Sequence, residues 1–473
     1  MGTISAALGV MTGALNADQE ALNVVANNVA NANTTGYTEE TPNWQQNAPI
    51  DAGGVLVGDG VTEAGATSQR DRVLQERLDQ QQQLASASGT RLTALNSIQA
   101  LFTPDSGAAG ATAGDIGSDI TSFFNSFSSL ESDPTNNALR EQVLSSASTL
   151  AGDISSTASS LNAQSAAIDQ EASGVVSQVN SLTSAIAQLN LEIESSSPHA
   201  DAGTLEDQRQ QDLSQLSKLV GINQVTTENN GLSVTTTSGE LLVSEGQSFQ
   251  LNTGTVNGAT DFFLGGKDVT AELAAGGGQL SGYLTARSVD IPGALSSLDQ
   301  LAYGISTAVN AANNAGTDLD GATGTAANPL NIFNEPAQAA GSAAAMTVTM
   351  TDPSQIAAAG AGNGTGDNSN AVAMANLAKG LIVNGQTPIN YYSNFVSTLG
   401  ATVAEVQTEN TAQNASVTQL QTENNALSSV NLNDEAAAMS KLENSYQAAS
   451  QVFTILNTIM TSALNMGVET AVA

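Results

Sequence analysis

The chain has 473 residues, of which 45 are acidic and 11 basic, giving a formal charge of −34 at pH 7. This charge argues against nucleic-acid binding and against docking on an anionic membrane, because both partners need clustered Lys and Arg. The absence of cysteine excludes disulfides and cysteine-based metal centres. Hydrophobic residues make up 40% of the chain and aromatic residues only 4%, a balance that suits packed helices better than an aromatic substrate pocket.

The first predicted element is an N-terminal helix with one apolar stripe. Its large apolar residues recur at alternating steps of three and four, with one polar step at Asp18. The stripe consists of Leu8, Met11, Leu15, Leu22, Val25 and Val29. No basic residue precedes Arg70 and no signal-peptidase pattern is present, so we expect export without a cleaved signal. No apolar run reaches the roughly 18 residues of a spanning helix, so we expect no membrane insertion.

Helical patterns continue through the first half of the chain. Residues 72–102 have a helical composition, and the densest basic cluster of the chain lies at their start. The cluster consists of Arg70, Arg72, Arg77 and Arg91. Acidic residues lie between these arginines, which indicates a solvated helix face rather than an anion site. A heptad ladder at 161–193 predicts a further long helix.

The middle of the chain changes character at residues 222–278. This segment is rich in Thr, Val and Gly, with turn signals and short alternating runs that are typical of strands. A helical pattern resumes near Leu280. Residues 314–345 predict an irregular loop, and 346–350 a short strand. We therefore predict a small β domain inserted between helical regions.

The last part of the chain is helical again. A second heptad ladder, at 399–427, precedes a C-terminal helix whose apolar stripe has the same spacing as the first. The large residues of this stripe are Met439, Leu442, Tyr446, Phe453, Leu456 and Met460.

These elements predict a mainly α fold with an inserted β domain and long coiled-coil-like terminal and inner helices. Residues 1–40 and 431–473 are expected to form a terminal helical domain that lines an inner tube. Residues 41–221 and 279–430 would form a helical core domain, and 222–278 the outer β domain. A chain that pairs its own ends and places a β domain outside suits a filament subunit.

Candidate residues for chemistry are few. The single histidine, His199, lies in a predicted loop, and a Ser-His-Asp triad could use only this residue. The run Asp-Leu-Asp-Gly at 318–321 lacks the first and last ligands of a calcium loop. The glycine-rich run at 360–366 lacks the spacing of a phosphate loop. We therefore predict no catalytic, cofactor or metal site and no enzymatic activity.

One run of residues identifies a family. The sequence ANNVANANTTGYT at 26–38 resembles a signature shared by flagellar rod, hook and hook-associated 1 proteins. The matching positions are Asn27, Asn28, Asn31, Asn33, Gly36 and Tyr37. Asn side chains can hydrogen-bond backbone at a helix end, and glycine permits positive φ in the turn that follows. The runs LEDQR at 205–209, GDNSNA at 366–371 and SVNLNDE at 429–435 are similar to the hook-associated protein 1 family in particular.

The resemblance implies a structural subunit of the bacterial flagellum at the hook–filament junction, extracellular after type III export. The implied partners are copies of itself in a ring, the hook protein, hook-associated protein 3 and an export chaperone on the C-terminal helix. We expect the assembly interface in the two terminal stripes, which would fold fully only when neighbouring subunits cover them. The chain departs from the family in its short length and in Glu39 and Glu40, where a basic residue is common.

Alternative interpretations come from two classes. The chain could be another flagellar axial protein, namely hook-associated protein 3, a distal rod protein or the hook protein. It could also be an acidic secreted adhesin or a glycan hydrolase. A hydrolase would need a cleft with two carboxyl groups roughly 5–9.5 Å apart.

Overall fold

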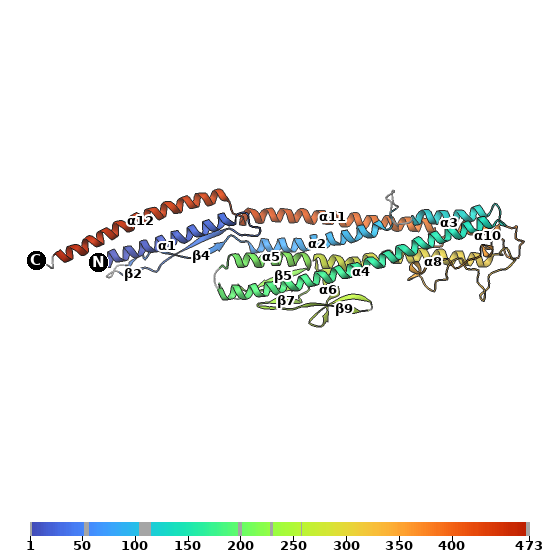
Figure 1. Ribbon diagram of the computed structural model, residues 1–473, viewed down its shortest axis with the longest axis horizontal. Coiled ribbons are helices and arrows are strands. Elements are labelled where there is room, and N and C mark those ends of the chain that lie inside the picture. Colours follow the sequence, from blue (N-terminus) through green and yellow to red (C-terminus); the bar gives the residue numbers. More distant parts are fainter. Residues whose placement is uncertain are drawn as a thin grey trace.

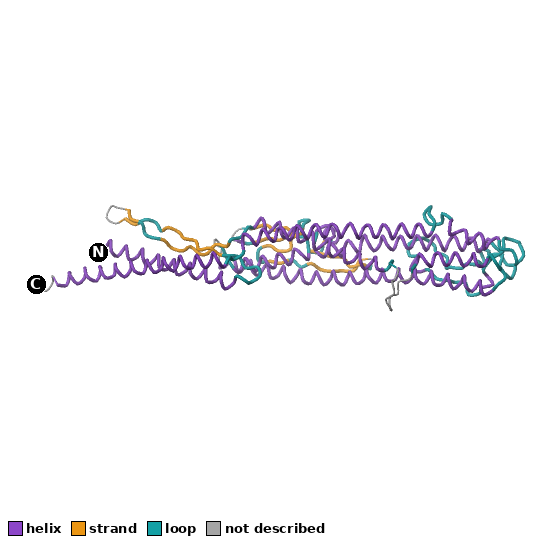
Figure 2. Tube along the Cα trace, turned by 90° about the horizontal axis from the view of Figure 1, so that it is seen from above, coloured by secondary structure: helices purple, strands orange, loops and turns teal. Residues whose placement is uncertain are grey.

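The computed structural model describes residues 2–51, 56–103, 115–196, 201–227, 230–256 and 258–469. The molecule is long and narrow, with both termini at the same end (Figures 1 and 2). Its described part is mainly helical, with four small antiparallel sheets, which confirms the predicted fold class. Three parts can be distinguished: a terminal tier, a helical core and a β domain.

The terminal tier contains the two terminal helices and a β hairpin. α1 (Gly2–Asn31) packs along α12 (Leu432–Glu469), and both extend away from the core (Figure 1). The hairpin consists of β1 (Glu40–Gln46) paired with β4 (Val61–Ser68), and of β2 (Ile50–Asp51) paired with β3 (Leu56–Val57) nearer its tip. It lies beside α1 and points in the same direction as the helices (Figure 2).

The hairpin differs from the sequence prediction, which assigned residues from 41 onward to the helical core. The physical reason lies in β1, whose sequence ETPNWQQ shows none of the apolar alternation that marks a strand. Pro42 cannot donate to the ladder, and the register shifts between Pro42 and Trp44. The strand is therefore held by its pairing with β4 rather than by its own propensity.

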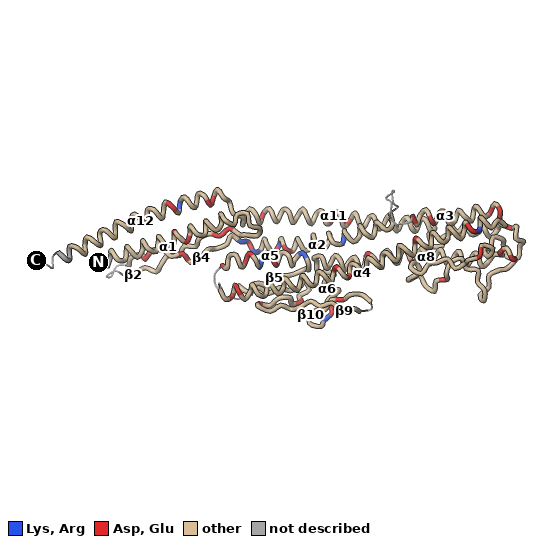
Figure 3. The backbone as a smooth tube through the Cα atoms, in the orientation of Figure 1, with Lys and Arg blue, Asp and Glu red and all other residues tan. Residues whose placement is uncertain are grey.

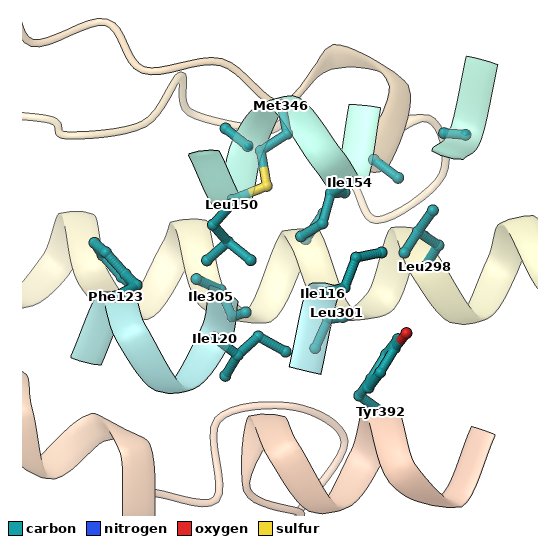
Figure 4. Close-up of a cluster of buried hydrophobic side chains, with 14 of the residues drawn as sticks. Ile116, Ile120, Phe123, Leu150, Ile154, Leu298, Leu301, Ile305, Met346 and Tyr392 are labelled. Carbon is teal, nitrogen blue, oxygen red and sulfur yellow. The ribbon is translucent and has the colours of Figure 1, made fainter. Parts of the chain in front are cut away.

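The helical core is a bundle of long helices. Its members are α2 (Arg72–Ala100), α3 (Ile116–Leu130), α4 (Asn137–Ser196), α8 (Ile291–Ala315) and α11 (Pro388–Ser428), with the short α9 (Ser342–Ala345) and α10 (Ser369–Asn376). α4 has 60 residues, which corresponds to a length of about 90 Å. Apolar side chains from α3, α4 and α8 interdigitate inside the bundle, as Figure 4 shows for Ile120, Ile154 and Leu301.

Residues 316–341 contain no regular helix or strand and cover the core beside α8. Ile332 and Phe333 are fully buried there, and the Phe333 ring meets the edge of Phe123 at a centroid distance of 5.5 Å. The strand predicted at 346–350 is wrong, because only a single bridge between Val348 and Phe333 forms. Pro336 follows shortly after Phe333 and cannot donate a ladder hydrogen bond, so the pairing does not extend.

The β domain packs against the second half of α4. One sheet contains β5 (Ile222–Thr226), β6 (Leu232–Thr236), β7 (Leu241–Ser244) and β8 (Gln247–Ser248), and the other contains β9 (Leu251–Val256), β10 (Ala259–Leu264) and β11 (Lys267–Asp268). The helices beside them are α5 (Thr204–Leu219), α6 (Thr270–Gly276) and α7 (Gly278–Thr285). A π-helical turn at Ala286–Asp290 joins α7 to α8.

α4 links the helical core to the β domain. Its residues Val143 to Ile168 belong to the apolar cluster of the bundle. Its residues Ala172 to Ala187 belong to a second cluster, which includes Val234 and Phe262 of the β domain. Because one continuous helix contributes to both clusters, the two parts are held in a fixed relation.

Candidate assembly interface

The two terminal helices share only a small apolar cluster. Ala21 and Val25 of α1 meet Leu442 of α12, and these are the buried members of the cluster. Leu22 and Met439 pack against its edge. Small alanines allow the helices to approach closely, but they bury little apolar area. The pair therefore has far less core than the bundle.

The predicted stripe of α1 is only partly covered. Val25 is buried, Val29 is 40% exposed, and the other four members are half-buried. Those four are Leu8, Met11, Leu15 and Leu22. The side chains that α1 buries most completely are shifted toward Ala17, Ala21 and Val25.

The predicted stripe of α12 is similarly incomplete. Leu442 is buried, whereas Tyr446 is 37% exposed. The half-buried members are Met439, Phe453, Leu456 and Met460. Both stripes thus lie on the side where the helices meet, and a single chain does not cover them.

The Asn-rich run builds the connection between the terminal tier and the rest of the molecule, and Asn28 is its centre. The Asn28 side chain is 1% exposed. Its Nδ2 donates to the backbone oxygen of Glu40 at 2.8 Å and to Oε1 of Glu435 at 2.8 Å. Its Oδ1 accepts from the backbone nitrogen of Glu40 at 3.0 Å and from the hydroxyl of Tyr37 at 2.8 Å. One amide therefore ties the end of α1, the start of β1 and the first turn of α12 together.

The other motif residues support this connection or lie at its surface. Asn27 donates to the Tyr37 hydroxyl, and Asn31 donates back to the backbone and side chain of Asn27. Asn33 is exposed. Gly36 has a φ of 81°, as predicted, and a Cβ there would overlap Gln211. Burial, followed by the charges of nearby carboxylates, raises the pKa of Tyr37, so its hydroxyl remains a hydrogen-bond donor.

The LEDQR run at 205–209 holds the other side of the connection. Thr38 donates to Asp207 through its backbone nitrogen at 2.9 Å and its hydroxyl at 2.7 Å. Arg70 pairs with Asp207 at 2.6 Å and also with Glu206. Since the Arg70 side chain is 6% exposed, the prediction of a solvated helix face is wrong for this residue. α2 begins only at Arg72, and Arg70 instead lies in the chain that enters it.

Arg209 extends the same network into the β domain. Its Nη1 donates to Oδ1 of Asn190 and to the backbone oxygen of Asn230, both at 2.8 Å. Burial lowers its pKa to about 10, which leaves it charged at neutral pH. The run therefore joins the terminal tier, the end of α4 and Asn230, which lies just before β6, at one place.

Acidic groups dominate the tier side of this connection (Figure 3). Burial and the charge of Asp434 raise the pKa of Glu39. Burial is also the main cause of the raised pKa of Glu435, which a hydrogen bond from Asn28 opposes. On this side, backbone and amide hydrogen bonds around Glu40 form the connection.

Two features of the terminal tier were not predicted from the sequence. One is the hairpin with its exposed Trp44. The other is a second apolar stripe on α12, formed by Val452, Ile455 and Ile459, all of which are exposed. Each of these residues directly precedes a member of the predicted stripe, and the spacing of three and four was present in the sequence.

The described part of the chain has few side chains arranged for catalysis or metal binding. No set of three or more His, Asp or Glu side chains is placed there to hold a metal ion. His199 lies outside the described residues. Asp318 accepts hydrogen bonds from the backbone of Asp320 and Ala322, as expected for a turn. A groove of about 450 Å³ between α2, α4 and α7 has one carboxylate, Glu171, in its described lining.

Within the described ranges, no helix has the length and apolar character that crossing a membrane would require.

Comparison with known families agrees with this arrangement. Residues 8–38, which span α1 and the Asn-rich run, match the family described as flagella basal body rod protein. Residues 105–327 match the helical domain of the flagellar hook-associated protein FlgK. The fold and these two matches define a flagellar protein of the rod and hook class.

Individual relatives narrow the class further. The chain is 30% identical to flagellar hook-associated protein 1 of Salmonella typhimurium over 322 residues, which cover 66% of this chain and 57% of the relative. It is 27% identical to flagellar hook-associated protein 1 of Bacillus subtilis, over 96% of this chain and 97% of the relative. The chain is thus similar to flagellar hook-associated protein 1 along most of its length. The alignment to the Salmonella relative thus spans little more than half of that protein.

A solved structure has the same fold. The flagellar hook junction protein FlgK from Burkholderia pseudomallei superposes with a TM-score of 0.64 at 18% sequence identity. The match covers 74% of this chain and 99% of that one.

Proposed function

We propose that this chain is a structural subunit of the bacterial flagellum that forms the hook–filament junction by self-assembly. Its place of action is the extracellular part of the flagellum, and it performs no catalysis. Similarity to hook-associated protein 1 relatives and the match of the N-terminal helix to the rod-protein family support this proposal.

The observation that carries the proposal is the incomplete burial of the terminal stripes. Burying a large apolar side chain is worth about 1.5–3 kcal/mol, whereas ordering each residue costs about 1–2 kcal/mol of backbone entropy. α1 and α12 contain 30 and 38 residues, but their shared cluster has three buried members. Neighbouring subunits that cover both stripes would supply the missing burial.

The proposed assembly interface consists of the two terminal stripes defined above. Its partners are further copies of the chain in a ring, the hook protein on one side and hook-associated protein 3 on the other. Before export, a chaperone would cover the stripe of α12. In this proposal the terminal helices line an inner tube, the helical core surrounds them, and the β domain faces outward.

Electron microscopy of flagella from a strain that lacks the gene tests the proposal. We expect hooks without filaments and filament protein shed into the medium, and normal filaments once the intact chain is restored. Normal filaments in the deletion strain would refute the role. Loss of the hooks themselves would favour a distal rod or hook protein, and intact flagella with lost surface attachment would favour an adhesin.

A further inference from the structure

The second stripe of α12 is an apolar surface that the chain itself does not cover. Val452, Ile455 and Ile459 directly precede Phe453, Leu456 and Met460, so the stripe is rotated by roughly 100° from the side that faces α1. Ile455 is 60% exposed. Lys441 precedes Leu442 in the same way and therefore lies on this stripe, at its end nearer the core. We call this surface the outer stripe of α12.

The hairpin presents a second uncovered apolar surface in the same tier. Trp44 is 52% exposed, and both Ile50 and Val57 are also exposed. Trp44 lies opposite Glu63 in the register of β1 and β4, and Ile50 lies opposite Val57. We call this surface the hairpin face.

The charges at the core-side end of the two surfaces are opposite. Lys441 is the only basic residue among 2–69 and 429–469, a region that contains 11 acidic residues. It is exposed and makes no ion pair within the described part of the chain. On the other side of α1, the carboxyl groups of Glu20 and Glu63 lie close enough to share a hydrogen bond. Among the residues that the structure describes, neither that pair nor Lys441 takes part in a salt bridge.

The two surfaces also match along the tier. Leu442 packs beside Ala21, so Lys441 and Glu20 lie at the same level. Along the outer stripe, Ile455 lies about 20 Å from Lys441, and the stripe ends at Ile459, about 27 Å from Lys441. The hairpin face runs from Trp44 to Ile50, also about 20 Å along a strand. On the outer stripe the apolar residues lie toward the tip from Lys441. On the hairpin face, Trp44 lies opposite Glu63, and Ile50 and Val57 lie farther toward the tip.

The surfaces lie on different sides of the tier. Both views place α1 between α12 and the hairpin (Figures 1 and 2), so one copy does not bring its own surfaces together. A contact between unlike patches on two copies is heterologous, and repetition of such a contact generates a ring or a helical array. This is the arrangement that a junction ring requires.

We propose that, in the assembled junction, the outer stripe of α12 in one copy packs on the hairpin face of the next copy, with Lys441 placed between Glu20 and Glu63. The inference rests on the proposed junction function and names the lateral contact that would build the ring. The occupant of the outer stripe is thus a second copy of this chain.

Charge reversal tests the ion pair. In the deletion strain, Lys441→Glu is expected to lower the fraction of cells with filaments by about tenfold or more. Adding Glu20→Lys and Glu63→Lys to the same chain should restore filaments. Lys379→Glu is the matched control, because Lys379 is an exposed lysine of the helical core. Secreted chain is measured in the medium, and a Lys441→Glu chain that fails because it is not exported would contradict the proposal.

Cross-linking tests the apolar part. Because the chain has no cysteine, Ile455→Cys and Val57→Cys can be expressed together as two singly substituted chains. Oxidation of isolated flagella should give a disulfide-linked dimer only when both variants are present. A dimer from either variant alone, or none from the mixture, would overturn the contact. If the unsubstituted chain were absent from the junction, the proposed function would fail instead.

Discussion

Asn28 shows how one side chain can control the connection between two parts of a molecule. Its amide satisfies both backbone groups of Glu40, the Tyr37 hydroxyl and one oxygen of Glu435. The sequence indicated that the motif positions matter, since Asn at a helix exit is suited to bonding backbone. It could not indicate Glu435, which lies 407 residues away. Long-range partners of this kind follow from the fold and not from local pattern.

Asn28→Ala is expected to loosen this connection. It leaves the Glu40 backbone and the Glu435 carboxylate without their partner, which costs about 1–3 kcal/mol. Hydrogen exchange at the amide of Glu40 should accelerate accordingly. Asn33→Ala is the matched control, because Asn33 belongs to the same motif and is exposed. Equal exchange in both variants would show that Asn28 does not hold the connection.

Asp79 is a buried carboxylate with no arginine or lysine bonded to it. It is 2% exposed, and its Oδ2 accepts from Gln210 and Gln224, each at 2.9 Å. Burial raises its pKa from the ordinary value of 3.8 to about 6. Between those two pH values the folded chain retains a proton that the unfolded chain has released. The free energy of unfolding therefore falls as the pH rises through this range.

Asp79→Asn should remove that dependence, since Asn keeps an oxygen for the two glutamines and carries no charge. We expect the variant to be more stable than the parent at pH 8, by on the order of 3 kcal/mol, and little changed below pH 4. Thermal unfolding at the two pH values measures this. An equal change in Tm at both would contradict the role of ionisation.

At the scale of elements, pattern predicted the long helices and the strands of the β domain, and it missed the hairpin. The heptads at 161–193 and 399–427 lie inside α4 and α11. The β1–β4 hairpin was missed because β1 lacks alternation and includes Pro42. The outer stripe of α12 was missed for a different reason. The sequence prediction used one apolar stripe of this helix, whereas a helix that contacts several neighbours needs more than one.

The terminal helices should be weakly protected before assembly. Their fully buried contacts lie near Ala21 and Leu442, whereas the outer halves of both helices have only half-buried stripes. Amide exchange on the monomer is expected to be fast at 4–15 and 449–464 and slow in α4 and α8 of the same sample. Strong protection along the full length of both terminal helices in a monomer would contradict this.

At the scale of the whole molecule, the parts that stabilise the fold are different from the parts proposed to assemble. The bundle and the β domain have their own apolar clusters, joined by α4. The terminal tier has little core of its own and is fixed to the rest through Asn28, Thr38 and Arg70. The helical ends and the β strands in the middle of the chain could be anticipated from composition and pattern. The relative placement of the hairpin could not, because nothing local to residues 40–68 indicates that α1 lies beside them.

The most direct test of the account is incorporation of a Leu456→Asp chain into flagella of the deletion strain. A carboxylate in the α12 stripe should prevent the helix from being covered by neighbours, because burying an unpaired charge is costly. Leu381→Asp, at a position 70% exposed in the helical core, should be tolerated. We predict exported, folded Leu456→Asp protein in the medium, hooks without filaments, and normal filaments with Leu381→Asp. Normal filaments carrying the Leu456→Asp chain at the junction would contradict the assignment of function to the terminal helices.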